Sequence, residues 1–169
     1  KIVEELQVYN LSTTSDDVKG IAFEKFLGRT FRGELGQFFT PRTIVEFMVS
    51  VLDPQEGEYI CDPCCGSGGF LIRAFEYVRE QIETELEQRK EEVKKQLIPE
   101  NYDDLKPKEQ EAIDAKVSDA FAKMNFEADI NNAKGRLRSL SFDCIYGTDA
   151  NPRMARTAKM NMIMHGDGH

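Results

Sequence analysis

The sequence lacks any long apolar run. None of its segments approaches the ~20 consecutive apolar residues of a membrane-spanning helix, and the first residues, Lys1-Ile2-Val3-Glu4-Glu5, become charged too early for a secretory signal peptide. We therefore predict no membrane association and a cytoplasmic location. The chain of 169 residues starts without Met and stops at His169 within a helical pattern, so we expect a fragment of a longer protein.

The chain also lacks an excess of positive charge. Its formal net charge of −8 does not suggest a protein that binds nucleic acid by itself. The charge is unevenly distributed, because residues 76–116 are rich in acidic side chains whereas residues 134–159 contain six basic and two acidic ones. The second segment fits either a local basic face or an ordinary solvated face.

The positions of the four cysteines do not indicate a metal site or a redox-active pair. Cys61 and Cys64 have a C-x-x-C spacing, but the other cysteines and the two histidines provide no zinc partners at matching spacing. The pair also lies in a glycine-rich segment rather than at a thioredoxin-like helix start. We predict no metal site and no disulfide framework, and we interpret the cysteines as small buried or turn residues.

The segment Asp62-Pro63-Cys64-Cys65-Gly66-Ser67-Gly68-Gly69-Phe70 is the strongest local signal. A strand is expected at about 58–62, a glycine turn at 63–69, and a helix from Gly69. The turn is not the G-x-G-x-x-G of dinucleotide sites, and a carboxylate at its start does not suit a pyrophosphate. A cationic ligand with a ribose suits it better, so the chemistry favours S-adenosylmethionine over NAD.

The remaining pattern is helical apart from one further strand. Apolar stripes predict helices from Thr40-Pro41 to Asp53, from Gly69 onward, at about 108–125, and from Asn151-Pro152 to about 165. A strand is expected at 142–147. The buried residues of the last two helices are expected to be Val117, Phe121, Met124, Met154, Ala158, Met162 and Ile163.

This order predicts an α/β fold with a parallel sheet. Right-handed crossover places the carboxyl ends of both strands at one edge of the sheet, so Asp62 and Asp149 should face the same crevice. A carboxylate after the second strand commonly accepts hydrogen bonds from ribose hydroxyls. Asp149 lies 87 positions beyond Asp62, and an inserted helical hairpin at 76–139 would explain the distance. A capping or turn role for Asp149 is the alternative.

Three motifs together resemble those of N6-adenine DNA methyltransferases. They are Gln37-Phe38-Phe39-Thr40-Pro41, the glycine segment at 62–70, and Tyr146-Gly147-Thr148-Asp149. Their order is most similar to that in modification (M) subunits of type I restriction-modification systems. The resemblance implies a partial Rossmann-like S-adenosylmethionine-dependent methyltransferase fold. It divides the chain into the end of an N-terminal helical domain (1–34), the cofactor-binding half of the catalytic domain (35–75 and 140–169) and the insertion (76–139).

The resemblance also implies roles for individual residues. Phe39, Thr40 and Pro41 would border the methionine part of S-adenosylmethionine, and Asp62 would hold its ammonium group. The turn residues would let the backbone approach the cofactor, Asp149 would bind the ribose, and two residues beside it would border the adenine. The full set of predicted cofactor-binding residues is Phe39, Thr40, Pro41, Asp62, Gly66, Ser67, Gly68, Asp149, Ala150 and Asn151.

One motif of the family is missing. Its Asn/Asp-Pro-Pro-Tyr/Phe string holds the flipped adenine, whereas Asn151-Pro152-Arg153-Met154 lacks the second proline and the aromatic residue. We therefore expect no catalytic residue in this chain, and place the catalytic motif beyond His169. The full-length protein would methylate DNA with a specificity and a restriction subunit as partners, while this fragment alone would be inactive. A non-catalytic cofactor-binding or subunit-docking module is the alternative, and a nicotinamide-dependent oxidoreductase is a more distant one.

Overall fold

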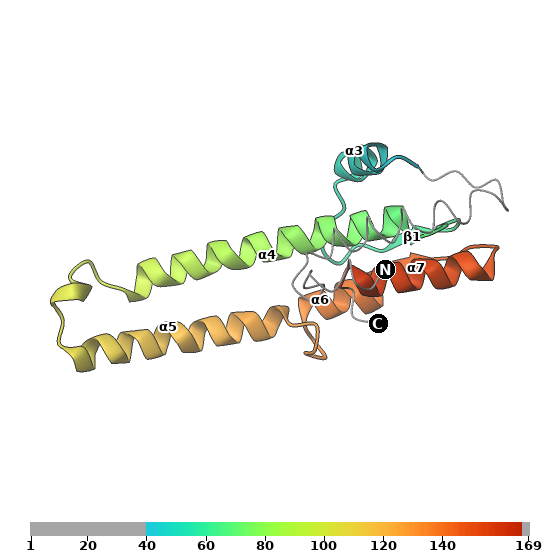
Figure 1. The fold of residues 1–169 in the computed structure, drawn as a ribbon. Coiled ribbons are helices and arrows are strands. Elements are labelled where there is room, and N and C mark those ends of the chain that lie inside the picture. The colour runs from blue at the N-terminus through green and yellow to red at the C-terminus, as the bar shows by residue number, and fades with distance from the viewer. Residues whose placement is uncertain (1–39, 167–169) are drawn as a thin grey trace, which may run out of the picture. The chain divides into compact units, whose positions relative to one another are not determined.

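The computed structural model describes residues 40–166. The elements follow one another along the chain as helices interrupted by two short strands (Figure 1). They are α3 (Arg42–Leu52), β1 (Ile60–Asp62), α4 (Gly69–Leu97), the 3₁₀ turn η1 (Tyr102–Asp104), α5 (Pro107–Ala128), α6 (Arg136–Ser139), the π-helical turn η2 (Leu140–Cys144), β2 (Ile145–Gly147) and α7 (Pro152–Met164). The predicted N-terminal helical domain at 1–34 and Phe39 lie outside the described residues.

The chain separates into two compact units. The described part of the first, here called the glycine-turn unit, comprises residues 40–52, 61–73 and 146–166. The second, here called the hairpin unit, comprises residues 53–60 and 74–145. The described parts of all three predicted motifs fall in the glycine-turn unit, and the interpretation of 76–139 as an insertion remains a prediction.

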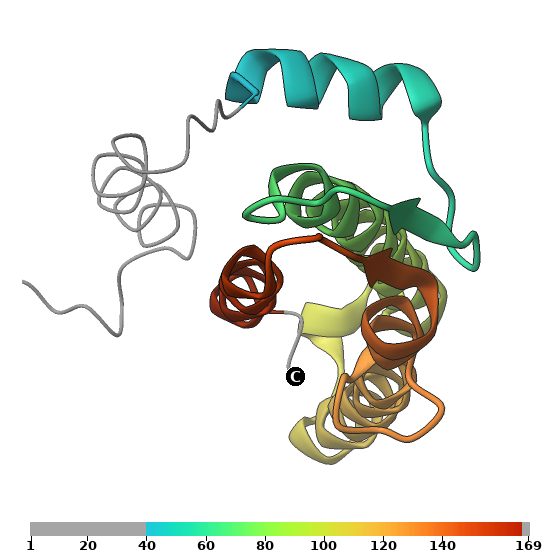
Figure 2. The same ribbon diagram turned by 90° about the vertical axis from the view of Figure 1, so that its right-hand side faces the viewer.

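The two strands form a parallel two-stranded sheet, β1 beside β2, with both arrows pointing the same way (Figure 2). The Thr148 N–H just after β2 donates to the carbonyl of Asp62 at the end of β1, at 2.9 Å. The expectation that both strands end at the same edge of the sheet is therefore confirmed for this pair. Their connection passes through the long helices α4 and α5, as a parallel crossover requires.

The strand predicted at 142–147 is wrong over its first half. Leu140, Ser141 and Cys144 are buried within the π-helical turn. Burial at 140, 141 and 144 has a helical spacing, whereas a half-buried strand would alternate every second residue. Phe142 instead lies under the guanidinium of Arg138, 4.2 Å from its ring centre. The helix that begins at Arg136 thus continues until β2 starts at Ile145.

The first strand is shorter than predicted, since it covers 60–62 rather than 58–62. Glu58 belongs to a turn: its N–H donates to the carbonyl of Gln55 at 3.1 Å, and its carboxylate accepts from the Gln55 N–H at 2.9 Å. Gly57 within this turn has a φ of +84°. The side chain of Glu58 therefore closes a turn, which explains why residue 58 is not part of β1.

Helices α4 and α5 confirm the two long helices expected between the strands. They form an antiparallel hairpin joined by η1 (Figure 1). Near the base of α4, Ala74, Phe75, Val78 and Ile82 are buried. Farther along, a small cluster of Leu86, Met124 and Ala128 packs with Val93 and Ala120. Of the residues expected to be buried on α5, Met124 is buried, while Val117 and Phe121 are only partly buried.

Partial burial of Phe121 has a clear cause. The ammonium groups of Lys90 and Lys94 on α4 lie 6.0 and 5.7 Å from the centre of its ring. Cation–π contacts of this kind place charged side chains over an aromatic face at the surface. At Phe121 the seam between α4 and α5 is thus covered by two long lysine side chains, beyond the apolar cluster, and this explains why the apolar pattern overestimated the core at this position.

Helix α3 confirms the helix predicted after Thr40-Pro41, with a shift of one residue at its start. The carbonyl of Pro41 accepts hydrogen bonds from the N–H groups of Ile44 (2.9 Å) and Val45 (3.2 Å), so Pro41 precedes the first helical residue. Asp53, with a φ of +46°, ends the helix as expected. Only Val45 and Val49 are buried; the exposed apolar residues are Ile44, Phe47, Met48, Val51 and Leu52.

Helix α7 starts where the sequence predicted. The side chain of Asn151 accepts a hydrogen bond from the Arg153 N–H at 2.9 Å, and Pro152 is the first helical residue. The buried face comprises Met154, Ala158, Asn161 and Met162. Ile163, which was expected to be buried, is 47% exposed. Within residues 40–166, no helix combines the length and the apolar character that crossing a bilayer would need.

Candidate functional site

The glycine turn after β1 is fastened to the segment after β2 by backbone hydrogen bonds. The Cys65 N–H donates to the carbonyl of Thr148 at 2.9 Å, next to the bond from Thr148 N–H to Asp62. The Thr148 hydroxyl adds a third link by donating to the carbonyl of Pro63 at 2.9 Å. Residues more than 80 positions apart in sequence therefore lie in contact at the carboxyl ends of the strands.

Asp149 lies at the centre of this arrangement. One of its carboxylate oxygens, Oδ2, accepts from the Gly66 N–H at 3.0 Å, and the other, Oδ1, accepts from the Asn151 N–H at 2.7 Å. The side chain thus joins the glycine turn to the start of α7. A carboxylate has about four acceptor positions, so each oxygen keeps one for a further donor. The turn role considered from the sequence is present, and it uses one acceptor position on each carboxylate oxygen.

Two glycines of the turn have conformations that other residues rarely adopt. Gly66 has a φ of +55° and Gly68 a φ of +89°. A Cβ on Gly68 would meet the Cα and Cβ of Ala158 on α7 at 3.3 Å, so this glycine also permits close packing of the two segments. A Cβ on Gly66 would meet nothing within 4 Å. The backbone at Gly66 is therefore open on the side where its Cβ would be.

Asn161 is a site-positioning residue whose contact was not foreseen. It is buried on α7, and its side-chain amide donates to the carbonyl of Ser67 at 2.8 Å. This bond satisfies a carbonyl of the glycine turn that the turn itself leaves free. The signal in the sequence was a polar residue between Ala158 and Met162 on the apolar face of a helix, where an unpaired amide would be costly.

Asp62 has a local partner in the structure. Its Oδ1 accepts from the Cys64 N–H at 3.0 Å, which forms a tight turn two residues long. Burial raises the pKa of the Cys65 thiol, and the negative charges of Asp62 and Asp149 raise this pKa further. Both carboxylates therefore act electrostatically on the same buried thiol, consistent with their position at one edge of the sheet.

The other predicted site residues fall into two groups. The first group lies next to the contacts just described and comprises Ser67, Ala150 and Asn151. The carbonyl of Ser67 accepts a hydrogen bond from the Asn161 side chain, and Ala150 and Asn151 directly follow Asp149 in the chain. Thr40 and Pro41 are exposed at the start of α3. Within residues 40–166, no hydrogen bond joins them to the glycine turn.

The cysteines behave as small structural residues among the described ranges. Cys65 and Cys144 are buried, Cys61 and Cys64 are exposed, and all four are free thiols. Burial also raises the pKa of Cys144, and the charge of Asp143 adds to this shift. A raised pKa reduces the thiolate fraction, which opposes metal binding and nucleophilic reactivity. No cluster of metal-ligating side chains occurs in the part of the chain that the structure describes.

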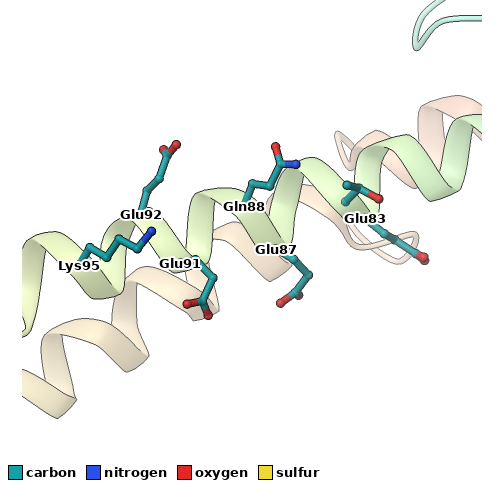
Figure 3. A pocket seen from close by; sticks show the side chains of 7 residues that line it. Glu83, Glu87, Gln88, Glu91, Glu92 and Lys95 are labelled. Carbon is teal, nitrogen blue, oxygen red and sulfur yellow. The ribbon is translucent and has the colours of Figure 1, made fainter.

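A hollow of ≈ 620 Å³ lies on the hairpin unit, away from the predicted motifs in sequence. Its described lining comes entirely from α4: Glu83, Thr84, Glu87, Gln88, Glu91, Glu92 and Lys95. Figure 3 shows Glu87 and Glu91 pointing to one side of the helix and Gln88 and Glu92 to another. Glu87 and Glu91 already pair with Lys90 and Lys94, at 2.6 and 2.5 Å. These side chains do not converge, so this is a solvated acidic helix face.

Comparison with known proteins identifies the family. The chain belongs to the N-6 DNA methylase family, whose model matches residues 14–99, just over half of the sequence. Over 48 residues it is 52% identical to the methylase subunit of the type I restriction enzyme EcoEI of Escherichia coli, covering 28% of this chain and 10% of that protein. Over 63 residues it is 48% identical to the MjaIX methylase subunit of Methanocaldococcus jannaschii, covering 36% and 11%.

A solved structure supports the same family at the level of the fold. The crystal structure of a modification subunit of a putative type I restriction enzyme from Vibrio vulnificus YJ016 is similar, with a TM-score of 0.51 and 26% identity. The match covers 90% of this chain and 22% of that one. The chain therefore spans only a small part of the proteins it matches. The resemblance to type I modification subunits, first suggested by three motifs, is confirmed.

Proposed function

We propose that this chain is the S-adenosylmethionine-binding part of a DNA adenine-N6 methyltransferase subunit in a type I restriction-modification system. The observation that carries the proposal is the position of Asp149, which binds the glycine turn through Gly66 while each carboxylate oxygen retains an acceptor position. The family and the relatives support the class of reaction. The choice of S-adenosylmethionine is supported by the acidic residue at the start of the glycine turn, which suits a cationic ligand.

The residues present suit S-adenosylmethionine. Asp149 would accept hydrogen bonds from the two ribose hydroxyls, and Ala150 and Asn151, which follow it, would border the adenine. The backbone at Gly66 is open, since a Cβ there would meet no heavy atom within 4 Å, and this would let the cofactor approach closely. Asp62 would attract the ammonium group, and Phe39, Thr40 and Pro41 would border the methionine part.

The cofactor would supply the methyl group, and this chain would hold and orient it. The acceptor would be the exocyclic amine of an adenine, which must leave the base stack to be reached. The 169 residues contain no Asn-Pro-Pro-aromatic string to hold that base, so the base-binding residues would come from the remainder of the full-length protein. DNA, a specificity subunit and a restriction subunit would be the partners.

The experiment measures S-adenosylmethionine binding to the full-length subunit by calorimetry, with Asp149→Asn as the variant. Loss of a charge-assisted hydrogen bond costs about 1.5–3 kcal/mol, so the dissociation constant should rise about 10-fold to 100-fold. Asp103→Asn on the exposed hairpin end is the matched control and should bind normally. A melting curve of each variant separates lost binding from lost folding. Unchanged affinity in folded Asp149→Asn would overturn the ribose assignment.

A non-catalytic cofactor-binding module is the second candidate, because this sequence lacks the family's base-holding string. The two candidates differ in one measurement. If the full-length protein, assembled with its partner subunits, transfers a labelled methyl group to adenine in duplex DNA, it is an enzyme. If S-adenosylmethionine binds but no label reaches DNA, the non-catalytic module is correct.

A further inference from the structure

Helix α7 is the one stretch of the glycine-turn unit, among its described residues, that has several cations and no acid. Residues 152–164 contain Arg153, Arg156 and Lys159, and neither Asp nor Glu. All three side chains are exposed. This local charge of +3 occurs in a chain whose net charge is −8. Arg153, Arg156 and Lys159 are called the basic face of α7 below.

Within residues 40–166, the basic face has no partners of its own. None of its three side chains forms an ion pair or a side-chain hydrogen bond with the rest of this range. Three cations of the hairpin unit differ in this respect. Lys90, Lys94 and Lys123 each pair with an acid three or four positions away on the same helix. These surface cations are neutralised locally, and those of α7 are not.

The direction of the basic face is fixed by packing. On the buried side of α7, Met154 and Ala158 are 1% and 4% exposed, and Ala158 contacts the backbone at Gly68. Asn161 is bound to the Ser67 carbonyl at 2.8 Å. Rotating α7 to hide its cations would expose these residues and break that hydrogen bond. The cations therefore point outward from the same unit that contains the candidate cofactor site.

The spacing of the basic face suits a row of phosphates. Successive members are three residues apart, so the stripe extends for about 9 Å along the helix at 1.5 Å per residue. Phosphates along one strand of duplex DNA repeat every 3.4 Å of helix axis, so about two or three of them fall within this length. Arg and Lys side chains are among the groups that contact phosphates in protein–DNA complexes, and they neutralise the phosphate charge.

We propose that the basic face of α7 binds the phosphate backbone of duplex DNA near the methylated base. The proposal rests on the proposed function and adds to it a surface that positions the DNA. Such contacts are independent of sequence, and they hold the duplex without reading it. They also explain how an acidic chain can lie against a polyanion, because attraction is confined to one helix face.

The experiment uses the full-length subunit, assembled with its partner subunits, and a fluorescently labelled duplex. Dissociation constants are measured over a range of salt concentrations for a variant carrying Arg153→Gln, Arg156→Gln and Lys159→Gln. Gln is about as favourable in a helix as Arg and Lys, so α7 should fold normally. Removing three phosphate contacts should reduce the slope of log K against log salt by about 2–3, and affinity at low salt should fall about tenfold or more.

The matched control is Lys108→Gln, Lys116→Gln and Lys123→Gln, which removes three exposed cations from α5. Its slope should equal that of the unmodified protein. Equal slopes for the two triple variants would overturn the proposal. Weakened assembly with the partner subunits at an unchanged slope would also overturn it, by making the basic face a protein-docking surface. The single charge reversal Arg156→Glu should still lower the slope by about 1, which provides a test if the triple variant folds poorly.

A separate readout distinguishes this proposal from the proposed function. S-adenosylmethionine binding should be unchanged in the α7 triple variant, because within residues 40–166 no hydrogen bond or ion pair joins these three side chains to the glycine turn. Failure of cofactor binding in the unmodified protein would overturn the proposed function. A normal cofactor affinity with an unchanged salt slope would overturn only the DNA-binding face.

Discussion

The glycine-turn unit and the hairpin unit are held together by different kinds of interaction. In the first, backbone groups and Asp149 join segments more than 80 positions apart, and glycines allow the close approach. In the second, two long helices share a small apolar cluster and the ion pair between Arg89 and Glu127, and further ion pairs form within each helix. The candidate ligand site thus depends on main-chain geometry, which should tolerate few substitutions, while the exposed surface of the helical hairpin should tolerate many.

The largest effect should follow from Gly68→Ala in the glycine-turn unit. The new side chain would place a non-glycine residue at φ +89°, which costs about 1–2 kcal/mol, and would press on Ala158 at 3.3 Å, which adds about 1–3 kcal/mol. The free energy of unfolding should fall by about 2–5 kcal/mol, as measured by chemical denaturation.

Gly69→Ala is the control for this variant. Gly69 is the first residue of α4, its φ is not positive, and a Cβ there would meet nothing within 4 Å. Stability should be unchanged or rise by up to about 1 kcal/mol, because Ala is favoured over Gly in helices. If both variants lost the same stability, main-chain conformation would not be what distinguishes this turn.

A smaller and more local effect is expected from Leu86→Ala in the hairpin unit. Leu86 is 8% exposed and packs with Met124 and Ala128. Truncating a buried Leu costs about 2–4 kcal/mol when the cavity does not collapse, and the exposed hairpin can partly collapse. Hydrogen exchange should accelerate in the second half of α4 and in α5.

The same exchange experiment tests whether the two units unfold separately. Amides of the glycine turn at 65–72 should keep their protection in Leu86→Ala, because none of their hydrogen bonds involves the Leu86 cluster. Glu87→Ala, at the exposed neighbouring position, should change neither region. If amides of both units lost their protection from exchange in the Leu86→Ala variant, the two units would unfold together.

The smallest effect should come from the ion pairs of Arg136. Its guanidinium donates to Glu56 at 2.8 Å through Nε and also contacts Glu85. The hydrogen bond from Arg136 lowers the pKa of Glu85 below its usual 4.5. A lowered pKa contributes stability that is present above the usual value and is lost as pH falls through the folded-state pKa. Arg136→Gln should therefore destabilise at pH 7 by about 1 kcal/mol or less.

Thermal melts at several pH values test this prediction. The difference between Arg136→Gln and the unmodified protein should be largest above pH 4.5 and shrink as the pH is lowered further. Arg89→Gln removes a longer, more exposed pair with Glu127 at 3.6 Å and should have little effect. A difference that grew on acidification would contradict the assignment to Glu85.

Helices were easier to predict from this sequence than strands. The helix beginning at Pro152 could be placed because apolar spacing and the capping residue Asn151 agree there, and the helix beginning at Gly69 because an apolar stripe follows the glycine turn. The second strand could not, because Phe142 and Ile145 favour a strand while burial of Leu140, Ser141 and Cys144 requires a helical turn. Burial depends on tertiary packing, which a local pattern does not contain.

The sequence predicted which residues of the candidate site lie near one another, but it did not predict the hydrogen bonds between them. Parallel-strand topology implied that Asp62 and Asp149 would meet at one sheet edge. It did not indicate that Asp149 would bind the Gly66 N–H or that Asn161 would bind the Ser67 carbonyl. Those partners depend on the orientation of side chains across segments 83 and 94 positions apart. Helical spacing alone cannot supply that information.

The hydrogen bonds between the glycine turn and residues 148–149 have a further consequence for chain connectivity. These hydrogen bonds close a loop of the chain that includes α4, α5 and β2. One end of the loop is fixed at the glycine turn, before α4 begins, and the other at residues 148–149, after β2 ends. Doubling the length of a flexible closed loop costs only about 0.6 kcal/mol in chain entropy. The intervening hairpin can therefore be shortened, extended or exchanged for another foldable segment with little thermodynamic effect on the closure. Residues 98–106, at the tip of the hairpin, are accordingly a suitable point for inserting a reporter domain.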